Sequence, residues 1–221
     1  MIQRVYEQST KSRQLCRVIV ATDDSRIEDH VRSFGGEVLL TSVSHTSGTE
    51  RIGEVIQLLG QSGIADFSIV VNIQGDEPEL NPEQIDLAVE CFSDASVQIS
   101  TLMKQITNEE DIFNPNVVKV VVDSHSEALY FSRSTIPYLR GLQQAEWFSK
   151  QVFFKHIGLY AYRIDILKKI VQLPPGSLEK AESLEQLRWL ENGFRIKVVP
   201  TVFETVSVDT PEDLLKLTNK F

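Results

Sequence analysis

The segment FSIVVNI, residues 67–73, constrains the fold more than any other feature, because its consecutive side chains are mostly apolar. A strand that is apolar on both faces is typical of a parallel sheet with helices on both sides. Two β-branched runs, at 17–22 and 37–42, alternate with helical patterns in the same part of the chain. This alternation predicts an α/β fold with a doubly wound, mostly parallel, Rossmann-like sheet.

Helices in the first half are marked by their starting residues. Ser25 and Glu28 predict a capping box at the start of the first helix. Apolar residues at helical spacing predict a second helix over 49–59. Asn81 is predicted to cap a third helix, which has Pro82 in its first turn.

The middle of the chain is richer in strands. Runs at 117–123 and 128–134 flank a polar SHSE turn, which predicts a hairpin. Strict alternation over 155–163 predicts a strand with His156 and Tyr160 on one face. Three elements are predicted to follow: a helix over 178–193, a strand over 195–202 and a helix capped by Thr210.

Composition limits the partners and the compartment. Acidic residues outnumber basic ones, 31 to 22, and the basic stripe of a nucleic-acid-binding protein is missing from this sequence of 221 residues. The polar start MIQRVYEQ does not resemble a signal peptide, and no apolar run is long enough to cross a membrane. Cys16 and Cys91 lack a ligand spacing, so each is predicted to be a buried free thiol. We expect a cytoplasmic protein without nucleic-acid or membrane partners.

Acidic side chains follow the predicted strands, where ligands bind in open α/β sheets. Asp76 comes directly after the 67–73 strand, and it is either a turn residue before Pro78 or a ligand for Mg²⁺. Asp209 has the same two interpretations near the other end of the chain. Asp23 and Asp24 also follow a strand, but the capping signal beside them favours a structural role.

Other polar candidates are weaker when each is taken alone. The stretch Ser47-Gly48-Thr49-Glu50-Arg51 is either a loop before a helix cap or part of an anion site. Arg133 and His156 are polar residues in apolar strands, either paired structurally or lining a pocket. Neither a Walker loop nor G-x-G-x-x-G occurs. The residues alone therefore predict an α/β domain that binds an anionic ligand through a metal.

Taken together, the motifs resemble a known family. VIVATDD, SGTER, VVNIQGDEP, ALYFSRSTIP, KHIGLYAYR and AESLEQLRWLENG occur in the order found in 3-deoxy-manno-octulosonate (Kdo) cytidylyltransferases, the CMP-Kdo synthetases. The resemblance runs from residue 1 to about residue 215. It implies a nucleotide-diphospho-sugar transferase-like fold. It also implies that CTP and Kdo give CMP-Kdo and pyrophosphate, with Mg²⁺, in lipopolysaccharide assembly.

The resemblance also implies roles for individual residues. Asp76 and Asp209 would share Mg²⁺, and Gln74 would lie between the nucleotide and the sugar acid. Arg51 would lie near the sugar acid and act with these three in catalysis. The expected nucleotide-loop residues are Ser47, Gly48 and Thr49, and the expected sugar-acid pocket consists of Arg133, His156, Tyr160, Glu185 and Gln186. The family further implies one domain over 1–221, with a β-rich sugar-binding and dimerisation lobe over 123–199 and a homodimer contact through roughly 133–155.

One family feature is not matched. A strand and a loop of the type A-R-x-x-S-x-R-L-P-x-K-P come before the helix that here begins MIQRVYEQ, so its triphosphate contacts cannot be assigned to this sequence. We expect the numbered chain to leave two neighbouring strands unpaired and to bind CTP weakly. The alternatives are a non-catalytic binding protein or inert fragment, and an enzyme that activates another sugar acid.

Overall fold

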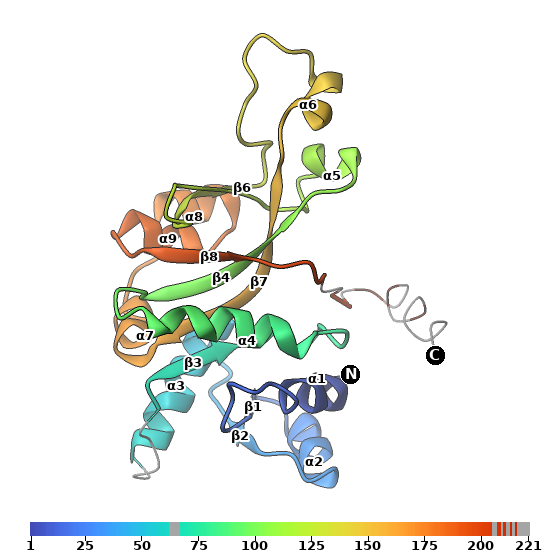
Figure 1. Cartoon of the computed structure of the whole chain (residues 1–221). Helices are drawn as coiled ribbons and strands as arrows, with labels where there is room; N and C mark the ends of the chain where they lie inside the picture. The colour runs from blue at the N-terminus through green and yellow to red at the C-terminus, as the bar shows by residue number, and fades with distance from the viewer. Residues whose placement is uncertain (62–66, 205–206, 209, 211–212, 214, 216–221) are drawn as a thin grey trace.

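The computed structural model of the chain describes residues 1–61, 67–204, 207–208, 210, 213 and 215. Strands and helices alternate through the first half, so the predicted α/β class is confirmed. The first elements form a small unit at one end of the molecule (Figure 1). They are α1 (Ile2–Ser9), β1 (Val20–Thr22), α2 (Ser25–Ser33), β2 (Val38–Leu40) and α3 (Gly48–Gln61).

A six-stranded sheet forms the centre of the molecule. Its strands are β3 (Ile69–Asn72), β4 (Ile99–Gln105), β5 (Lys119–Val122), β6 (Ala128–Ser132), β7 (Phe154–Arg163) and β8 (Ile196–Pro200). The order is β6-β5-β7-β4-β8, and β3 also pairs with β7. The predicted hairpin is confirmed as the antiparallel pair β5–β6.

The prediction of a mostly parallel sheet is corrected by the strand directions. β7 runs antiparallel to β3, β4 and β5, while β4–β8 and β1–β2 are the parallel pairs among the described residues. An apolar strand reveals that both faces are covered but not the direction of its neighbours. The apolar residues of β3 are half-buried rather than fully buried, and its pairing with β7 is antiparallel.

Alternating residues of β7 enter two separate cores. Leu159 and Ala161 pack with Ile85 of α4 (Pro82–Glu90). Tyr160 and Tyr162 enter the core on the other face. That face is covered by α7 (Ile164–Ile170) and α9 (Gln186–Glu191). Helices on both faces explain why apolar side chains occur on both sides of β7.

Two predicted helices have different boundaries from those expected. The first is capped by Asp24, whose carboxylate accepts from the Arg26 amide, and Ser25 is already helical. The predicted helix over 178–193 is two helices, α8 (Ser177–Glu182) and α9. Ser183 separates them in the left-handed conformation, with φ of 52°. By contrast, the predicted cap at Asn81 is confirmed, and it forms a capping box with Gln84.

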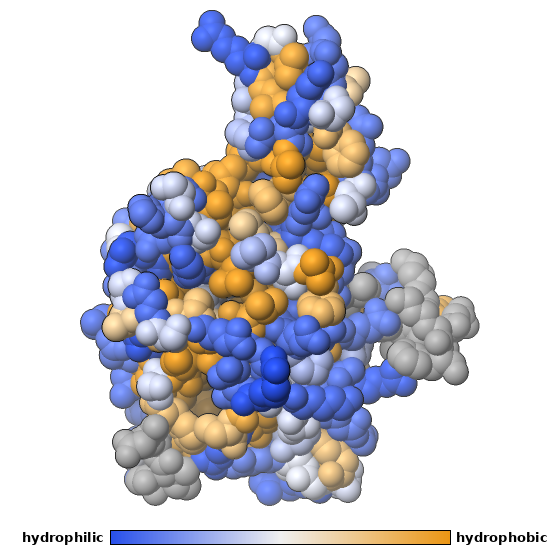
Figure 2. Space-filling view, viewed as in Figure 1, coloured by the Kyte–Doolittle hydropathy of each residue, from blue (hydrophilic) through white to orange (hydrophobic). Residues whose placement is uncertain are grey.

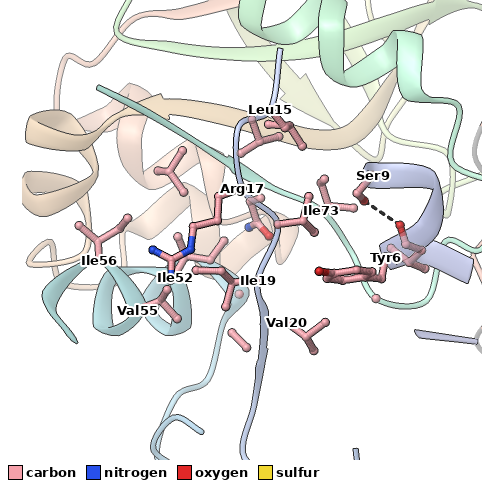
Figure 3. Close-up of a pocket in the computed structure, with 18 of the residues that line it drawn as sticks. Tyr6, Ser9, Leu15, Arg17, Ile19, Val20, Ile52, Val55, Ile56 and Ile73 are labelled. Atoms are coloured by element: carbon pink, nitrogen blue, oxygen red, sulfur yellow. Dashed lines mark hydrogen bonds between the residues drawn. The ribbon is translucent and has the colours of Figure 1, made fainter. Parts of the chain in front are cut away.

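A cavity of about 410 Å³ separates β1 from β3. Val20 and Ala21 line one side, residues 69–75 line the other, and α3 contributes Ile52, Val55 and Ile56 (Figure 3). Hydrophobic surface surrounds a hollow in the lower half of the molecule (Figure 2). β1 and β3 are thus neighbours without pairing to each other within the described part of the chain.

A narrow arm projects from the central sheet (Figure 1). It consists of α5 (Glu109–Phe113), α6 (Gln144–Lys150) and the chain between β6 and β7. Trp147 is buried in its own small core with Ile112 and Phe153. Two short elements complete the description: η1 (Cys91–Ser93), which continues α4, and the turn at half-buried Ser126 in the β5–β6 hairpin.

The two cysteines differ from each other in burial. Cys16 is exposed, contrary to the prediction, and Cys91 is half-buried. Both are free thiols. Within the described ranges, no helix has the length and apolar character needed to cross a membrane.

Candidate active site

Asp76 lies just beyond the carboxyl end of β3, as the sequence predicts. Its carbonyl accepts a 2.9 Å hydrogen bond from the Val208 amide. This bond brings a segment from the end of the chain against the QGDEP turn. Asp209 follows in sequence but lies outside the described residues, as does most of the helix predicted from Thr210. Gln74 is exposed at the same strand end.

The loop before α3 meets the turn before α9. Ser47 Oγ donates to Glu185 Oε1 over 3.0 Å, and Thr49 Oγ1 donates to Glu185 Oε2 over 2.6 Å. The structure thus joins the expected nucleotide loop to the expected sugar-acid pocket through one carboxylate. Gly48 permits a close approach, because a Cβ there would lie 3.3 Å from the side-chain amide of Asn72 at the end of β3.

Arg51 lies one turn into α3 and lines the cavity between β1 and β3 together with Gly48 and Gln74. Its guanidinium is held by polar groups that follow β1 and β2, including Thr41 and Asp23. Three of the predicted residues therefore border one cavity, at the carboxyl ends of neighbouring strands.

His156 and Tyr160 lie on one side of β7, with ring centroids 5.3 Å apart. The Nε2 atom of His156 lies 2.9 Å from the Thr101 hydroxyl. Burial of the imidazole among Phe131 and Tyr160 lowers the pKa of His156 to about 3, although the residue as a whole is half-buried. The accessible part borders a second cavity of about 310 Å³, which Glu77 also lines. His156 is therefore neutral at physiological pH.

Several buried donors near this side of β7 lack hydrogen-bond partners among the described residues: Tyr160 Oη, Tyr162 Oη and Trp189 Nε1. Thr101 lies near the first hydroxyl, and Thr49 and Asn72 lie near the second, without hydrogen-bond geometry. Burial raises the pKa of both tyrosines, so both stay protonated as donors. Buried unpaired donors are costly, and a polar ligand can satisfy them.

Arg133 is held apart from these groups by α8. Its Nε donates to the Glu182 carbonyl over 2.6 Å, and its Nη1 donates to the Pro115 carbonyl over 3.1 Å. Its own carbonyl accepts from Lys119 Nζ over 2.7 Å. Gln186 is buried in the first turn of α9. The structure thus fixes Arg133 beside the α8–α9 pair, without a hydrogen bond to the other pocket candidates in the described residues.

The carboxylate beyond the end of β3 has the chemistry of a ligand for a hard cation such as Mg²⁺. Mg²⁺ is usually held by one or two carboxylates together with substrate phosphates, rather than by a full protein cage. Asp76 supplies a half-buried carboxylate beside the Val208 segment. Across the described part of the chain, no three His, Cys, Asp or Glu side chains gather as a complete metal site. Asp76 is therefore suited to share an ion with a phosphate-bearing substrate.

Comparisons with known proteins define the class and then the family. Residues 1–197 match the family described as Cytidylyltransferase. The chain is 54% identical over 220 residues to the 3-deoxy-manno-octulosonate cytidylyltransferase of Parabacteroides distasonis, covering 98% of this chain and 85% of the relative. It is 50% identical to the enzyme of the same name from Cytophaga hutchinsonii, covering 99% and 86%. The chain belongs to the family of 3-deoxy-manno-octulosonate cytidylyltransferases.

Solved structures agree with this assignment. A CMP:2-keto-3-deoxy-manno-octonic acid synthetase complexed with CTP has a TM-score of 0.89 and 39% identity, covering 99% of this chain and 86% of that one. A 4-diphosphocytidyl-2C-methyl-D-erythritol synthase from Anaerococcus prevotii, 11% identical with a TM-score of 0.57 and coverage of 99% and 88%, shares the fold alone. The resemblance seen in the motifs is therefore confirmed.

Proposed function

We propose that the chain is a nucleotidyltransferase that activates Kdo, converting CTP and Kdo into CMP-Kdo and pyrophosphate. The observation that carries the proposal is the 54% identity over 98% of the chain to an enzyme with this activity in its name. The site is consistent with it, because the loop at Ser47 and Thr49 shares Glu185 with the start of α9. One carboxylate can then place a nucleotide and a sugar acid side by side.

The reaction needs positioning and charge stabilisation more than proton transfer. The anomeric hydroxyl of Kdo attacks the α-phosphorus of CTP, the new C–O–P bond forms, and the bond to pyrophosphate breaks. Arg51 presents a planar guanidinium, which suits an anionic carboxylate or phosphate. Gln74, exposed beside it, offers both an amide donor and an acceptor. Neutral His156 and the protonated Tyr160 would offer hydrogen-bonding groups to the sugar acid.

A metal ion completes this proposal. Mg²⁺ held by Asp76 and Asp209 would neutralise phosphate charge and lower the pKa of the attacking hydroxyl. Asp76 lies beside the segment that leads to Asp209, since Val208 binds its carbonyl.

We also propose a homodimer formed through the arm. Apolar side chains are exposed on it, namely Phe113, Tyr138, Leu142, Phe148 and Val152. Hydrophobic atoms are visible along the arm in Figure 2. A contiguous apolar surface on a protruding element commonly marks a protein interface. The free thiols fit a reducing compartment, so the proposed location is the cytoplasm.

Product formation tests the function directly. The chain is incubated with CTP and Mg²⁺, and pyrophosphate and CMP-sugar are measured with Kdo, with sialic acid and with no sugar. Pyrophosphate release that requires Kdo is the expected result. Release with sialic acid alone would support the alternative sugar acid, and no release in any arm would support a non-catalytic protein.

A further inference from the structure

The Arg51 guanidinium is held by residues that directly follow β1 and β2. Nη1 donates to Thr41 Oγ1 over 2.6 Å and, more weakly, to the Ser42 carbonyl over 3.5 Å. Nη2 donates to Asp23 Oδ2 over 3.2 Å. Asp23 directly follows β1 and Thr41 directly follows β2. The carboxyl ends of both strands therefore hold one arginine side chain.

Thr41 is itself oriented to accept from the arginine. Its amide donates to the Thr22 carbonyl over 2.9 Å, and its hydroxyl donates to the same carbonyl over 3.2 Å. Because the hydroxyl hydrogen is used on Thr22, the lone pairs of Oγ1 face a donor. Thr41 is buried, so this side of the guanidinium contact is built into the β1–β2 pair.

Asp23 forms the other side, and its neighbour Asp24 does not share the role. The Asp23 carboxylate binds Arg51, whereas the Asp24 carboxylate caps α2 and pairs with Arg26. Two adjacent aspartates thus serve different partners. The sequence favoured a structural role for both beside a cap predicted at Ser25, whereas Asp24 is the cap and Asp23 binds Arg51.

The contacts leave part of the guanidinium for a ligand. Arginine has five N–H donors, and the three contacts made by the described residues leave two for a bound anion. Arg51 lines the same cavity as Gln74, at the strand ends where the substrates are proposed to bind. A long side chain that is already held loses less freedom when it binds an anion.

We propose that Asp23 is a positioning residue that, with Thr41, holds the Arg51 guanidinium ready for an anionic group of the substrate. The inference rests on the proposed function, in which Arg51 contacts the sugar acid.

Asp23 has two opposing effects on anion binding. Its negative charge weakens the attraction of Arg51 for an anion, while its hydrogen bond keeps the guanidinium in place. The carboxylate is 37% exposed, so water and salt screen its charge. The hydrogen bond is local and is not screened in this way. The positioning effect of the hydrogen bond is therefore larger than the repulsion by the charge. Removal of the Asp23 charge should then weaken binding of the sugar acid.

Kinetics of four variants of the full chain test the inference. Asp23→Asn is expected to raise KM for Kdo about 5- to 10-fold, because a neutral amide oxygen is a weaker acceptor for Arg51 than the carboxylate. Its kcat and its KM for CTP should stay within about 2-fold of the unmodified chain. Asp24→Asn is the matched control, because asparagine keeps the helix cap while losing the same charge. Arg51→Gln is the reference, and adding Asp23→Asn to it should change nothing further.

Nitrogen-15 NMR of the arginine side chains gives a second readout that needs no activity. Hydrogen bonds at both Nη atoms slow rotation of the guanidinium, so the Arg51 Nη hydrogens should give separate signals, assigned by their loss in Arg51→Gln. These signals should average in Asp23→Asn and stay separate in Asp24→Asn.

Unchanged Arg51 signals in Asp23→Asn, a fall in KM for Kdo, or additive effects in the double variant would each overturn the inference. If the chain makes no CMP-Kdo, the NMR result still decides it. Averaged signals would then support the positioning role while the proposed function alone fails.

Discussion

The Thr49 hydroxyl donates a 2.6 Å hydrogen bond to the Glu185 carboxylate, which joins the start of α3 to the start of α9. Thr49 is buried, and the second carboxylate oxygen accepts from Ser47. Any movement of the loop before α3 therefore changes the turn between α8 and α9. The loop expected to hold the nucleotide and the helix expected to hold the sugar acid are connected by one side chain.

Glu185→Gln tests this connection. An amide has one accepting oxygen, so one of the two hydroxyls at Ser47 and Thr49 loses its partner. We expect the free energy of unfolding to fall by about 1–2 kcal/mol, measured in urea. KM for CTP should rise several-fold. The matched control is Glu191→Gln, on the same helix but exposed and bonded to Ser177. An equal change of KM for CTP in both variants would contradict the connection.

Asp76→Asn tests the proposed metal ligand. The substitution keeps the size of the side chain and removes the charge that attracts Mg²⁺. In limiting Mg²⁺, we expect turnover to fall by about 100-fold, since metal-organised positioning supplies several kcal/mol. Asp29→Asn, an exposed change on α2, should leave turnover unaltered. Near-normal turnover of Asp76→Asn in limiting Mg²⁺ would rule out the assignment.

His156 predicts a specific pH dependence of stability. Burial lowers its pKa to about 3 in the folded chain, against about 6.5 when unfolded. The unfolded chain therefore binds more protons between these values, so stability is complete above pH 6.5 and falls as the pH drops below it. The loss should approach 1.4 kcal/mol per pH unit near pH 5.

Urea unfolding at pH 7.5, 6.0 and 5.0 measures this slope. His156→Gln should reduce the slope between pH 6.0 and 5.0, whatever its effect on stability at pH 7.5. His30→Gln, on exposed α2, should keep the original slope. Equal slopes in all three proteins would show that His156 is not the group responsible.

Lys119 is fully buried, and its ammonium donates to three carbonyls, those of Asn114, Val117 and Arg133. Burial lowers the pKa of Lys119. Lys119→Met keeps most of the volume but leaves the carbonyls unpaired, so stability should fall by about 3 kcal/mol in urea. Lys197→Met, which removes one contact to the His125 carbonyl, should cost far less. A similar loss in both variants would indicate a general effect of removing lysine.

The exposed apolar side chains of the arm predict that the chain forms a dimer. Sedimentation at micromolar concentration should give a dimer for the unmodified chain and a monomer for the double variant Tyr138→Ser and Val152→Ser, which removes exposed apolar area from the arm. Val43→Ser is the control, because Val43 is more exposed than either residue but lies far from the arm in sequence. A monomer in the unmodified chain, or dissociation by the control, would contradict an interface on the arm.

Most elements could be predicted because their signals are local. The Asn81 cap and the β5–β6 turn depend on residues a few positions apart, and both are confirmed. Strand direction is not local, and so the antiparallel pairing of β7 could not be read from its apolar pattern. The break at Ser183 was also missed. A residue with positive φ is usually recognised in a sequence because it is a glycine, and this one is a serine.

In the candidate site, too, contacts between segments that are distant in sequence could not be predicted. The sequence placed Asp76 and Gln74 at a strand end, and the structure agrees. The family resemblance assigned Ser47 to the nucleotide and Glu185 to the sugar acid, and nothing in either segment indicates that the two side chains meet. The contacts of Arg51 with Thr41 and Asp23 depend on how two strands and a helix pack together. Such contacts are visible only once the chain has folded.

The position of β4 has a consequence for synthesis of the protein on the ribosome. β4 lies between β7 and β8, so it pairs with residues 154–162 on one edge and 196–200 on the other. At typical elongation rates, the last of these residues is made roughly 5–20 s after β4 itself. Residues 154–162 are made about halfway through that interval, so the edge of β4 that pairs with β8 stays open longest. Translation speed between β4 and β8 therefore determines how long the nascent chain needs protection from aggregation.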